Sequence, residues 1–316
     1  MKNRRNADLE GAITASLDDP SAYKVYADWL EENGEDGRAT LIREQLKKKP
    51  KPEHDLLDEK TLGPLWKFWA AFSWKWGFIS SANLSERTNL KAGPALAATL
   101  AHPLGAFVRN IELYVIDRPQ PAVDALTEAP TTLRGLRFFS PLKLARIEGL
   151  ERVFTQLEQL VLDGKFELAT PLKLPRAWEI AIEIDALSDA NVKQVNALEA
   201  PLLQGLTLGL AQTTDAAKKL APLFARKFEK LDYLVISDAA DLDALCELIA
   251  VAPFAPQLKG IELDGRLSER GVEALRSSTR LAKLKDITLG GSVDKRFVAS
   301  LRKKGRSVER YDSSAE

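Results

Sequence analysis

The chain has 316 residues, of which 45% are hydrophobic and 28% are charged, an ordinary composition for a soluble globular protein. Its 45 basic residues balance 45 acidic ones, so no overall field favours nucleic acid or an anionic membrane. The single cysteine, Cys246, excludes an intramolecular disulfide framework and fits a reducing compartment. Because no apolar run has the length of a signal peptide or a membrane span, we expect a cytoplasmic protein that binds neither nucleic acid nor membrane.

Residues 8–46 have the spacing of three short helices joined by turns. Asp19 is a natural N-cap residue ahead of the second helix. The apolar face of that helix repeats at i, i+3, i+4 and i+7 from Tyr23 to Leu30, the spacing of an amphipathic helix. We therefore predict a small all-α domain over residues 1–50.

The second helix contains the stretch Tyr26-Ala-Asp-Trp-Leu-Glu-Glu32, and Arg38-Ala39 follows in the third. With these motifs, residues 8–46 resemble the bacterial repeat-companion domain, a module found ahead of leucine-rich repeats. The resemblance implies no assigned enzymatic activity. It suggests a role in bacterial signalling, regulation or defence.

Asp28 lies in the middle of this motif, and Lys24 four residues earlier is an ion-pair partner at helical spacing. One interpretation of Asp28 is a contact to a ligand, which would make the helical domain a sensor with the repeats as its readout. The other is a structural residue that fixes a nearby turn or backbone group. We favour the structural interpretation.

Residues 51–76 are predicted to form a linker and an aromatic N-terminal cap. The run Lys47–Pro52 is basic and interrupted by prolines, so it cannot continue a helix, and helical spacing resumes over residues 55–72. Four tryptophans fall close together here: Trp66, Trp69, Trp74 and Trp76. Such a cluster is either a binding platform or a hydrophobic cap on the open end of a repeat array, and we favour the cap.

From residue 77 to 316, apolar residues recur at i, i+3 and i+5, as in Leu258, Ile261 and Leu263. The first residues of these patterns are Ile79, Val108, Leu133, Leu157, Ala177, Leu203, Leu231, Leu258 and Leu284, and a degenerate copy runs through Val308. Most spacings lie between 20 and 29 residues, as in leucine-rich repeats, where each unit supplies one strand and one helix. We predict an α/β leucine-rich-repeat solenoid, a horseshoe with parallel strands on its concave face and helices on its convex face.

The segments that begin at Leu187 and Leu267 resemble the helix starts of ribonuclease-inhibitor-type leucine-rich repeats, with Ser188 and Ser268 as N-cap residues. The chain departs from that family eight residues after each leading apolar residue, where the usual Asn or Cys is missing. Without a buried asparagine ladder, the turns must satisfy their backbone groups in another way. We expect a divergent array in which the repeat over residues 140–152 is the least regular and has a short helix.

Side chains alternate across a strand, so residues i+2, i+4 and i+6 of each repeat point to the concave side. The candidate partner-binding residues at these positions are Glu112, Tyr114, Arg137, Phe139, Asp163, Glu179, Glu183, Tyr233, Glu262, Asp264 and Asp286. Seven are acidic and one is basic, although the whole chain is neutral, which predicts a docking face for a basic segment of a protein partner. The competing interpretation is chance, since a register error of one residue would rewrite the set.

The sequence lacks the usual patterns of catalytic and cofactor-binding chemistry. Neither His54 nor His102 has a neighbouring cysteine or histidine at metal-ligand spacing, and Cys246 lies on an apolar helix face, as a buried residue would. No nucleotide-binding loop or nucleophile elbow occurs. We therefore expect no enzymatic activity, cofactor or metal, and hypothesise a scaffold or regulator that binds a protein such as a protease. A hydrolase with a site on the rim of the solenoid is the enzyme alternative.

Overall fold

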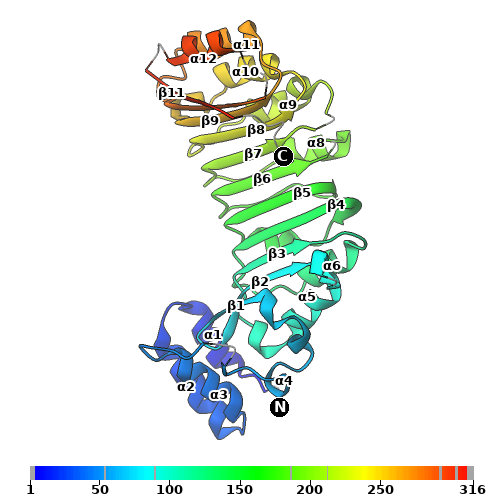
Figure 1. Ribbon diagram of the computed structural model, residues 1–316, viewed down its shortest axis with the longest axis vertical. Helices are drawn as coiled ribbons and strands as arrows, with labels where there is room; N and C mark the ends of the chain where they lie inside the picture. The colour runs from blue at the N-terminus through cyan, green and yellow to red at the C-terminus, as the bar shows by residue number, and fades with distance from the viewer. Residues whose placement is uncertain are drawn as a thin grey trace. The chain divides into compact units, whose positions relative to one another are not determined.

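The computed structural model describes residues 4–52, 55–88, 90–185, 187–211, 213–291, 294–302 and 305–311 (Figure 1). The chain divides into two compact units, Met1–Phe138 and Phe139–Glu316. Among the described residues, eleven strands hydrogen-bond side by side in chain order, from β1 to β11. The sheet is open and mostly parallel, and helices alternate with its strands, which confirms the predicted α/β class.

Unit 1 begins with three helices, α1 (Ala7–Ala15), α2 (Pro20–Glu32) and α3 (Asp36–Gln45). As predicted, Asp19 caps α2, because its carboxylate accepts a hydrogen bond from the Ser21 amide at 2.8 Å. The three helices expected at this end of the chain are therefore confirmed.

These helices share their hydrophobic core with the residues that follow them. The rings of Tyr23 and Tyr26 on α2 each lie 5.8 Å from the ring of Phe78, measured between centroids. Phe78 also packs against Phe107 at 4.7 Å, and all four residues are at most 4% exposed. Since aromatic side chains bury the largest apolar areas, the helices and the first strands of the sheet stabilise each other.

The helical spacing over residues 55–72 corresponds to two short elements and not to one continuous helix. These are α4 (Glu59–Leu62) and the 3-10 helix η2 (Gly63–Ala71). Gly63 has a positive φ of 52°, and Phe68 leaves the helical region at φ −139° and ψ 25°. These two departures interrupt the regular helical hydrogen bonds.

A β-hairpin that the sequence did not predict precedes the first repeat. Strand β1 (Phe72–Lys75) runs antiparallel to the first part of β2 (Phe78–Ser85), and Trp76 and Gly77 form the turn with φ values of 49° and 80°. Two successive positive φ values are the type I′ geometry, which usually selects Asn-Gly or Gly-Gly. Because a tryptophan occupies the first position, the usual hairpin signal is missing from the sequence.

The remainder of unit 1 contains the first repeats. Its elements are η3 (Glu86–Thr88), α5 (Ala92–Ala101), η4 (Pro103–Gly105), β3 (Asn110–Tyr114), α6 (Gln120–Leu126) and the start of β4 (Gly135–Ile147). Strands β2 and β3 are parallel, with Ala82 opposite Ile111 and Leu84 opposite Leu113. These four residues are at most 1% exposed, as the i, i+3, i+5 pattern predicted.

Unit 2 continues the alternation of strands and helices. Its elements after β4 are α7 (Glu151–Phe154), β5 (Gln159–Leu168), β6 (Glu179–Ile184), α8 (Asp189–Asn196), β7 (Gly205–Gly209), α9 (Ala216–Phe224), β8 (Tyr233–Ala239), α10 (Leu242–Val251), η5 (Ala255–Gln257), β9 (Gly260–Gly265), α11 (Glu269–Ser277), β10 (Asp286–Gly290), α12 (Lys295–Arg302) and β11 (Ser307–Arg310). Strands β5 to β11 are parallel to one another. The four-residue α7 confirms the short helix expected in the least regular repeat, and β11 confirms the degenerate copy through Val308.

The predicted register of the strands is confirmed. Leu258, Ile261 and Leu263 are at most 1% exposed, and the equivalent residues of the other repeats are also buried. Ser188 and Ser268 cap α8 and α11, as predicted. In the described repeats the pattern residues are therefore buried on one strand face, and most of the alternating residues on the other face are more exposed. None of the helices in the described part of the chain is long and apolar enough to cross a membrane.

The repeats lack an asparagine ladder, and side chains from the helices instead form hydrogen bonds to backbone groups of neighbouring repeats. Asn191 on α8 is 2% exposed and accepts a hydrogen bond from the Leu168 amide at 2.8 Å. Asp243 on α10 accepts hydrogen bonds from the amides of Ser268 at 2.9 Å and Gly271 at 3.1 Å. These contacts are the alternative means of backbone satisfaction that the sequence required.

Candidate partner-binding face

On one face of the sheet in unit 2, the side chains of neighbouring strands form three rows that cross the strands. The first row is Gln159, Glu179, Gly205, Tyr233, Gly260, Asp286 and Ser307, and the second is Val161, Ala181, Thr207, Val235, Glu262, Thr288 and Glu309. The third row is Asp163, Glu183, Gly209 and Ser237, with Asp264 and Gly290 paired on β9 and β10. We call this surface the open face.

Seven of the eleven predicted residues lie on the open face: Asp163, Glu179, Glu183, Tyr233, Glu262, Asp264 and Asp286. Phe139 is half-buried on β4, at the start of unit 2. Glu112, Tyr114 and Arg137 belong to unit 1, where the Arg87 guanidinium lies 3.9 Å from the centroid of the Tyr114 ring. The candidate site is therefore built from unit 2 alone.

The open face carries several carboxylates and no cationic side chain within its three rows. Among the described residues, no lysine or arginine lies within ion-pair distance of Asp163, Glu183, Glu262, Asp264 or Asp286. The face therefore keeps a negative charge that nothing within it compensates.

Crowding of the carboxylates is strongest where β5 and β6 lie side by side. Burial, then the charges of Asp163 and Asp238, raise the pKa of Glu183. Burial, then the charge of Asp185, raise the pKa of Asp163. In both cases the ionised form is disfavoured by lost hydration and by like charge, and a bound cation would offset the repulsion between like charges.

Glycines on neighbouring strands make room for the larger side chains of the face. A Cβ atom added to Gly209 would lie 2.7 Å from Cα of Glu183, so β7 approaches β6 closely at this pair. A Cβ atom added to Gly260 would lie 2.5 Å from the ring of Tyr233, so the ring lies across β9. Because glycines have no side chain, neighbouring groups of the open face can lie close to the backbone of the sheet at these positions.

Two tyrosines stand among the carboxylates of the face, Tyr233 on β8 and Tyr311 directly after β11. Tyr233 is 41% exposed and Tyr311 is 37% exposed. Burial and the charges of Glu262 and Asp286 raise the pKa of Tyr233, and burial and the charges of Asp264 and Glu262 raise the pKa of Tyr311 to about 12. Both phenols are therefore neutral at physiological pH and offer an apolar ring with a polar tip.

Sequence reasoning missed Glu309 and Tyr311 as members or neighbours of this surface. Glu309 pairs with Thr288 in the second row, and the Tyr311 amide donates a hydrogen bond to the Leu289 carbonyl at 3.1 Å. The ring of Tyr311 lies beside the position of a Cβ on Gly290, at 2.8 Å from it. Both residues follow from the periodic pattern once the degenerate repeat through Val308 is counted as a strand.

Asp28, the candidate in the helical segment, is paired with Arg43. The Arg43 guanidinium lies 2.7 Å from Asp28 and 2.7 Å from Glu31, and it therefore connects α3 to α2. Lys24, the partner that helical spacing suggested, does not make this ion pair. The contact gives Asp28 a structural role between two helices.

The other chemical groups do not gather into a site. Cys246 is fully buried, and burial raises the pKa of its thiol. Over the part of the chain that the structure describes, no three His, Cys, Asp or Glu side chains are grouped to hold a metal ion. His102 is buried in unit 1, and His54 lies outside the described residues.

Comparison with known proteins gives a fold and no family. No protein-family model matches the chain, and no curated protein matches it. The crystal structure of a Bacteroides fragilis protein is similar, with a TM-score of 0.61 and 17% sequence identity over 75% of each chain. At this identity the likeness concerns the fold alone. The resemblance of residues 8–46 to the repeat-companion domain, and the assignment of the repeats as leucine-rich, stay predictions.

Proposed function

We propose that this protein is a non-catalytic binding module that holds a basic, extended segment of a protein partner on the open face of unit 2. The observation that carries the proposal is the set of carboxylates on this face that have no ion-pair partner among the described residues. The aromatic rings of Tyr233 and Tyr311 beside them suit a partner with apolar as well as cationic side chains. A regulator or scaffold would use such a face without a chemical step.

The spacing of the carboxylates suits an extended segment. Glu179 on β6 and Asp286 on β10 lie in the same row, separated by four steps between adjacent strands. Neighbouring strands are about 4.8 Å apart, so the two carboxylates are roughly 19 Å apart along the row. An extended chain rises about 3.3 Å per residue, so a segment of about six residues spans this distance. Tyr233 lies between them and would contact the middle of the segment.

Electrostatics gives this interaction two measurable properties. Exposed ion pairs contribute about 0.2–1 kcal/mol each and are screened by salt, so several are needed and the affinity should fall as ionic strength rises. Glu183 and Asp163 have raised pKa values, so acidification protonates them more readily than an ordinary glutamate and an ordinary aspartate. Binding of a cationic segment should therefore weaken as the pH is lowered through the range where these groups titrate.

The test uses hexalysine as the basic probe and hexaglutamate as its opposite, with binding measured by isothermal titration calorimetry at low salt. The decisive variant reverses three charges on the face, Glu262→Lys, Asp264→Lys and Asp286→Lys. We expect hexalysine to bind the wild-type protein, hexaglutamate not to bind, and the variant to lose at least about tenfold in affinity for hexalysine. Circular dichroism checks that the variant is folded.

A matched control separates the face from the net charge. The substitutions Glu151→Lys, Glu199→Lys and Glu229→Lys change the net charge equally, at exposed positions in α7 and in connecting segments. This control should bind hexalysine nearly as well as the wild type. An equal loss in both variants, or no binding of hexalysine at low salt, would overturn the proposal. The same pair of variants, used as bait in affinity purification from the native host, would identify the physiological partner.

A further inference from the structure

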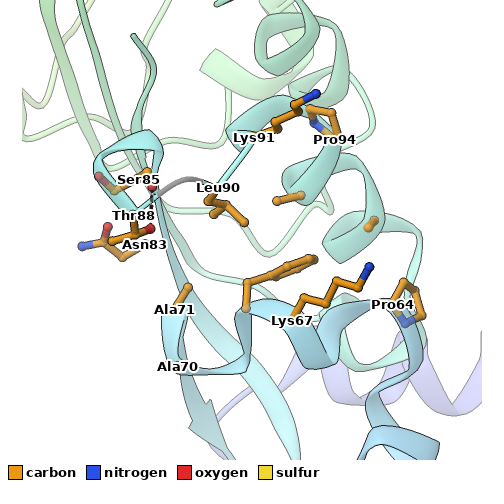
Figure 2. A pocket seen from close by; sticks show the side chains of 13 residues that line it. Pro64, Lys67, Ala70, Ala71, Asn83, Ser85, Thr88, Leu90, Lys91 and Pro94 are labelled. Atoms are coloured by element: carbon orange, nitrogen blue, oxygen red, sulfur yellow. Dashed lines mark hydrogen bonds between the residues drawn. The ribbon is translucent and has the colours of Figure 1, made fainter. Parts of the chain in front are cut away.

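Unit 1 contains a groove that is separate from the open face of unit 2. It has a volume of about 890 Å³ and lies between the 3-10 helix η2 and helix α5, next to the end of β2 (Figure 2). Phe68, Leu90, Ala95 and Ala98 supply much of its apolar lining. Binding sites for small molecules usually measure about 300–1,000 Å³ and are lined mainly by apolar groups, so this groove has suitable size and character.

The sequence explains why this space is not filled by side chains. Helix α5 has the sequence Ala-Gly-Pro-Ala-Leu-Ala-Ala-Thr-Leu-Ala, and its small residues Ala95 and Ala98 line the groove. On the other side, η2 ends in Ala70 and Ala71, and the non-helical backbone at Phe68 breaks the line of the helix. Much of the wall is therefore made of short alanine side chains, and Pro64, Lys67 and Phe68 are the larger groups of η2 that line the space.

The charges on the groove all have one sign. Lys67 and Lys91 line it, and none of its lining residues is acidic. Within the residues that the structure describes, neither lysine has a carboxylate at ion-pair distance. In Figure 2 Lys91 lies beside Pro94 on the wall formed by α5, and Lys67 lies beside Pro64 on the opposite wall formed by η2.

Another part of the groove is lined by polar groups, and some of their hydrogen-bonding atoms already have a partner within the protein. Ser85 and Thr88 lie there, as Figure 2 shows, and the Thr88 hydroxyl donates a hydrogen bond to the Ser85 carbonyl at 2.8 Å. The groove therefore offers two exposed ammonium groups at its edge, and most of its lining is apolar.

We infer that this groove is a binding site for a small amphiphilic carboxylate, an apolar chain or ring that bears one carboxyl group. The apolar part would lie against Phe68, Leu90 and the alanines, and the carboxylate would lie at the edge of the groove, beside Lys67 or Lys91. A neutral apolar ligand would fill the same space but would leave both ammonium groups without a counter-charge. An anion with no apolar part would gain no burial from the groove. This inference does not depend on the function proposed for the open face.

The experiment compares decanoate with decanamide, which has the same alkyl chain and no charge, by calorimetric titration of the 316-residue protein. We expect decanoate to bind the wild type more tightly than decanamide by up to about fivefold, since one exposed ion pair contributes up to about 1 kcal/mol. The double variant Lys67→Gln and Lys91→Gln should bind the two ligands equally. The matched double variant Lys48→Gln and Lys49→Gln removes two exposed charges outside the groove and should behave as the wild type.

A second pair of variants tests the apolar wall. Ala98→Leu places a larger side chain in the groove and should weaken both ligands by at least about tenfold, since it removes space that the chain would occupy. Ala97→Leu lies on the exposed side of the same helix and should have no effect. The inference is overturned if decanoate binds no better than decanamide, if both lysine double variants lose affinity equally, or if folded Ala98→Leu binds both ligands as well as the wild type.

Discussion

Replacing His102 by asparagine should make unit 1 less sensitive to acid. His102 is 6% exposed, and its Nδ1 accepts a hydrogen bond from the Leu104 amide at 3.2 Å, at the start of η4. Burial, together with the positive charge of Arg38, lowers the pKa of His102 to about 4. Asparagine can keep the hydrogen bond, as Asn6 does with the Asp8 amide at the start of α1, but it does not titrate.

The magnitude follows from proton linkage. The imidazole has an ordinary pKa of 6.5 in the unfolded chain and about 4 in the folded one, so unfolding takes up a proton between these values. Because the folded-state pKa is lowered, the fold favours neutral His102, and stability falls as the pH drops from 6.5 toward 4. The loss relative to neutral pH is about 1.4 kcal/mol at pH 5.5 and about 2.5 kcal/mol at pH 4.5.

Urea unfolding followed by tryptophan fluorescence measures this effect, because five of the six tryptophans lie in unit 1. The wild type and His102→Asn are compared from pH 7.5 to pH 4.5. Carboxylates titrate alike in both proteins, so the difference between them isolates the histidine. The wild type should lose about 2.5 kcal/mol more than the variant over this range. Equal losses in the two proteins would refute the reasoning, and so would an NMR titration that places the His102 ring near its ordinary pKa.

Three further outcomes follow from the structure. Gly105→Ala should destabilise unit 1 by about 3 kcal/mol, because the new Cβ would lie 2.0 Å from the carbonyl oxygen of Thr99. Gly11→Ala in helix α1 places a Cβ that meets no atom within 4 Å, and it should stabilise the protein by about 0.5–1 kcal/mol. Urea titrations of the two variants measure both changes in the free energy of unfolding. Asp243→Ala removes an acceptor that two backbone amides of the next repeat share, and thermal unfolding should show a loss of about 2 kcal/mol. Cys246, fully buried in unit 2, should react with a thiol reagent only after unfolding, and rapid labelling of the native protein would contradict its position in the core.

The repeats could be predicted because their signal is carried by residues that must be buried. In each repeat the apolar residues at i, i+3 and i+5 have no other place than the core, so Ile261 and Leu263 define their strand without help from distant residues. The hairpin of β1 and β2 could not be predicted in this way. Its turn depends on a positive φ at Trp76, a conformation that this residue type rarely adopts and that packing has to impose. The 3-10 geometry of η2 likewise depends on a break at Phe68 that periodicity does not reveal.

The candidate face was predictable in composition but not in its geometry. Alternation along each strand identified Glu183 and Tyr233 as members of the surface without any knowledge of the fold. The sequence does not show that the ring of Tyr233 lies over Gly260 of the next strand, because that glycine belongs to the following repeat. It also does not tell that Arg87 covers Tyr114 in unit 1, since this contact depends on the loop after β2.

The core that α2 shares with Phe78 and Phe107 limits how the helical segment can be exchanged between proteins. A fragment that ends soon after α3 would keep Tyr23 and Tyr26 but lose the rings against which they pack. A repeat array deprived of the helices would in turn expose Phe78 to solvent. The smallest portable piece is therefore longer than the sequence motif that marks it, and it extends through the hairpin as far as Phe107. Recombination within unit 1 should preserve folding only at boundaries that respect this shared core.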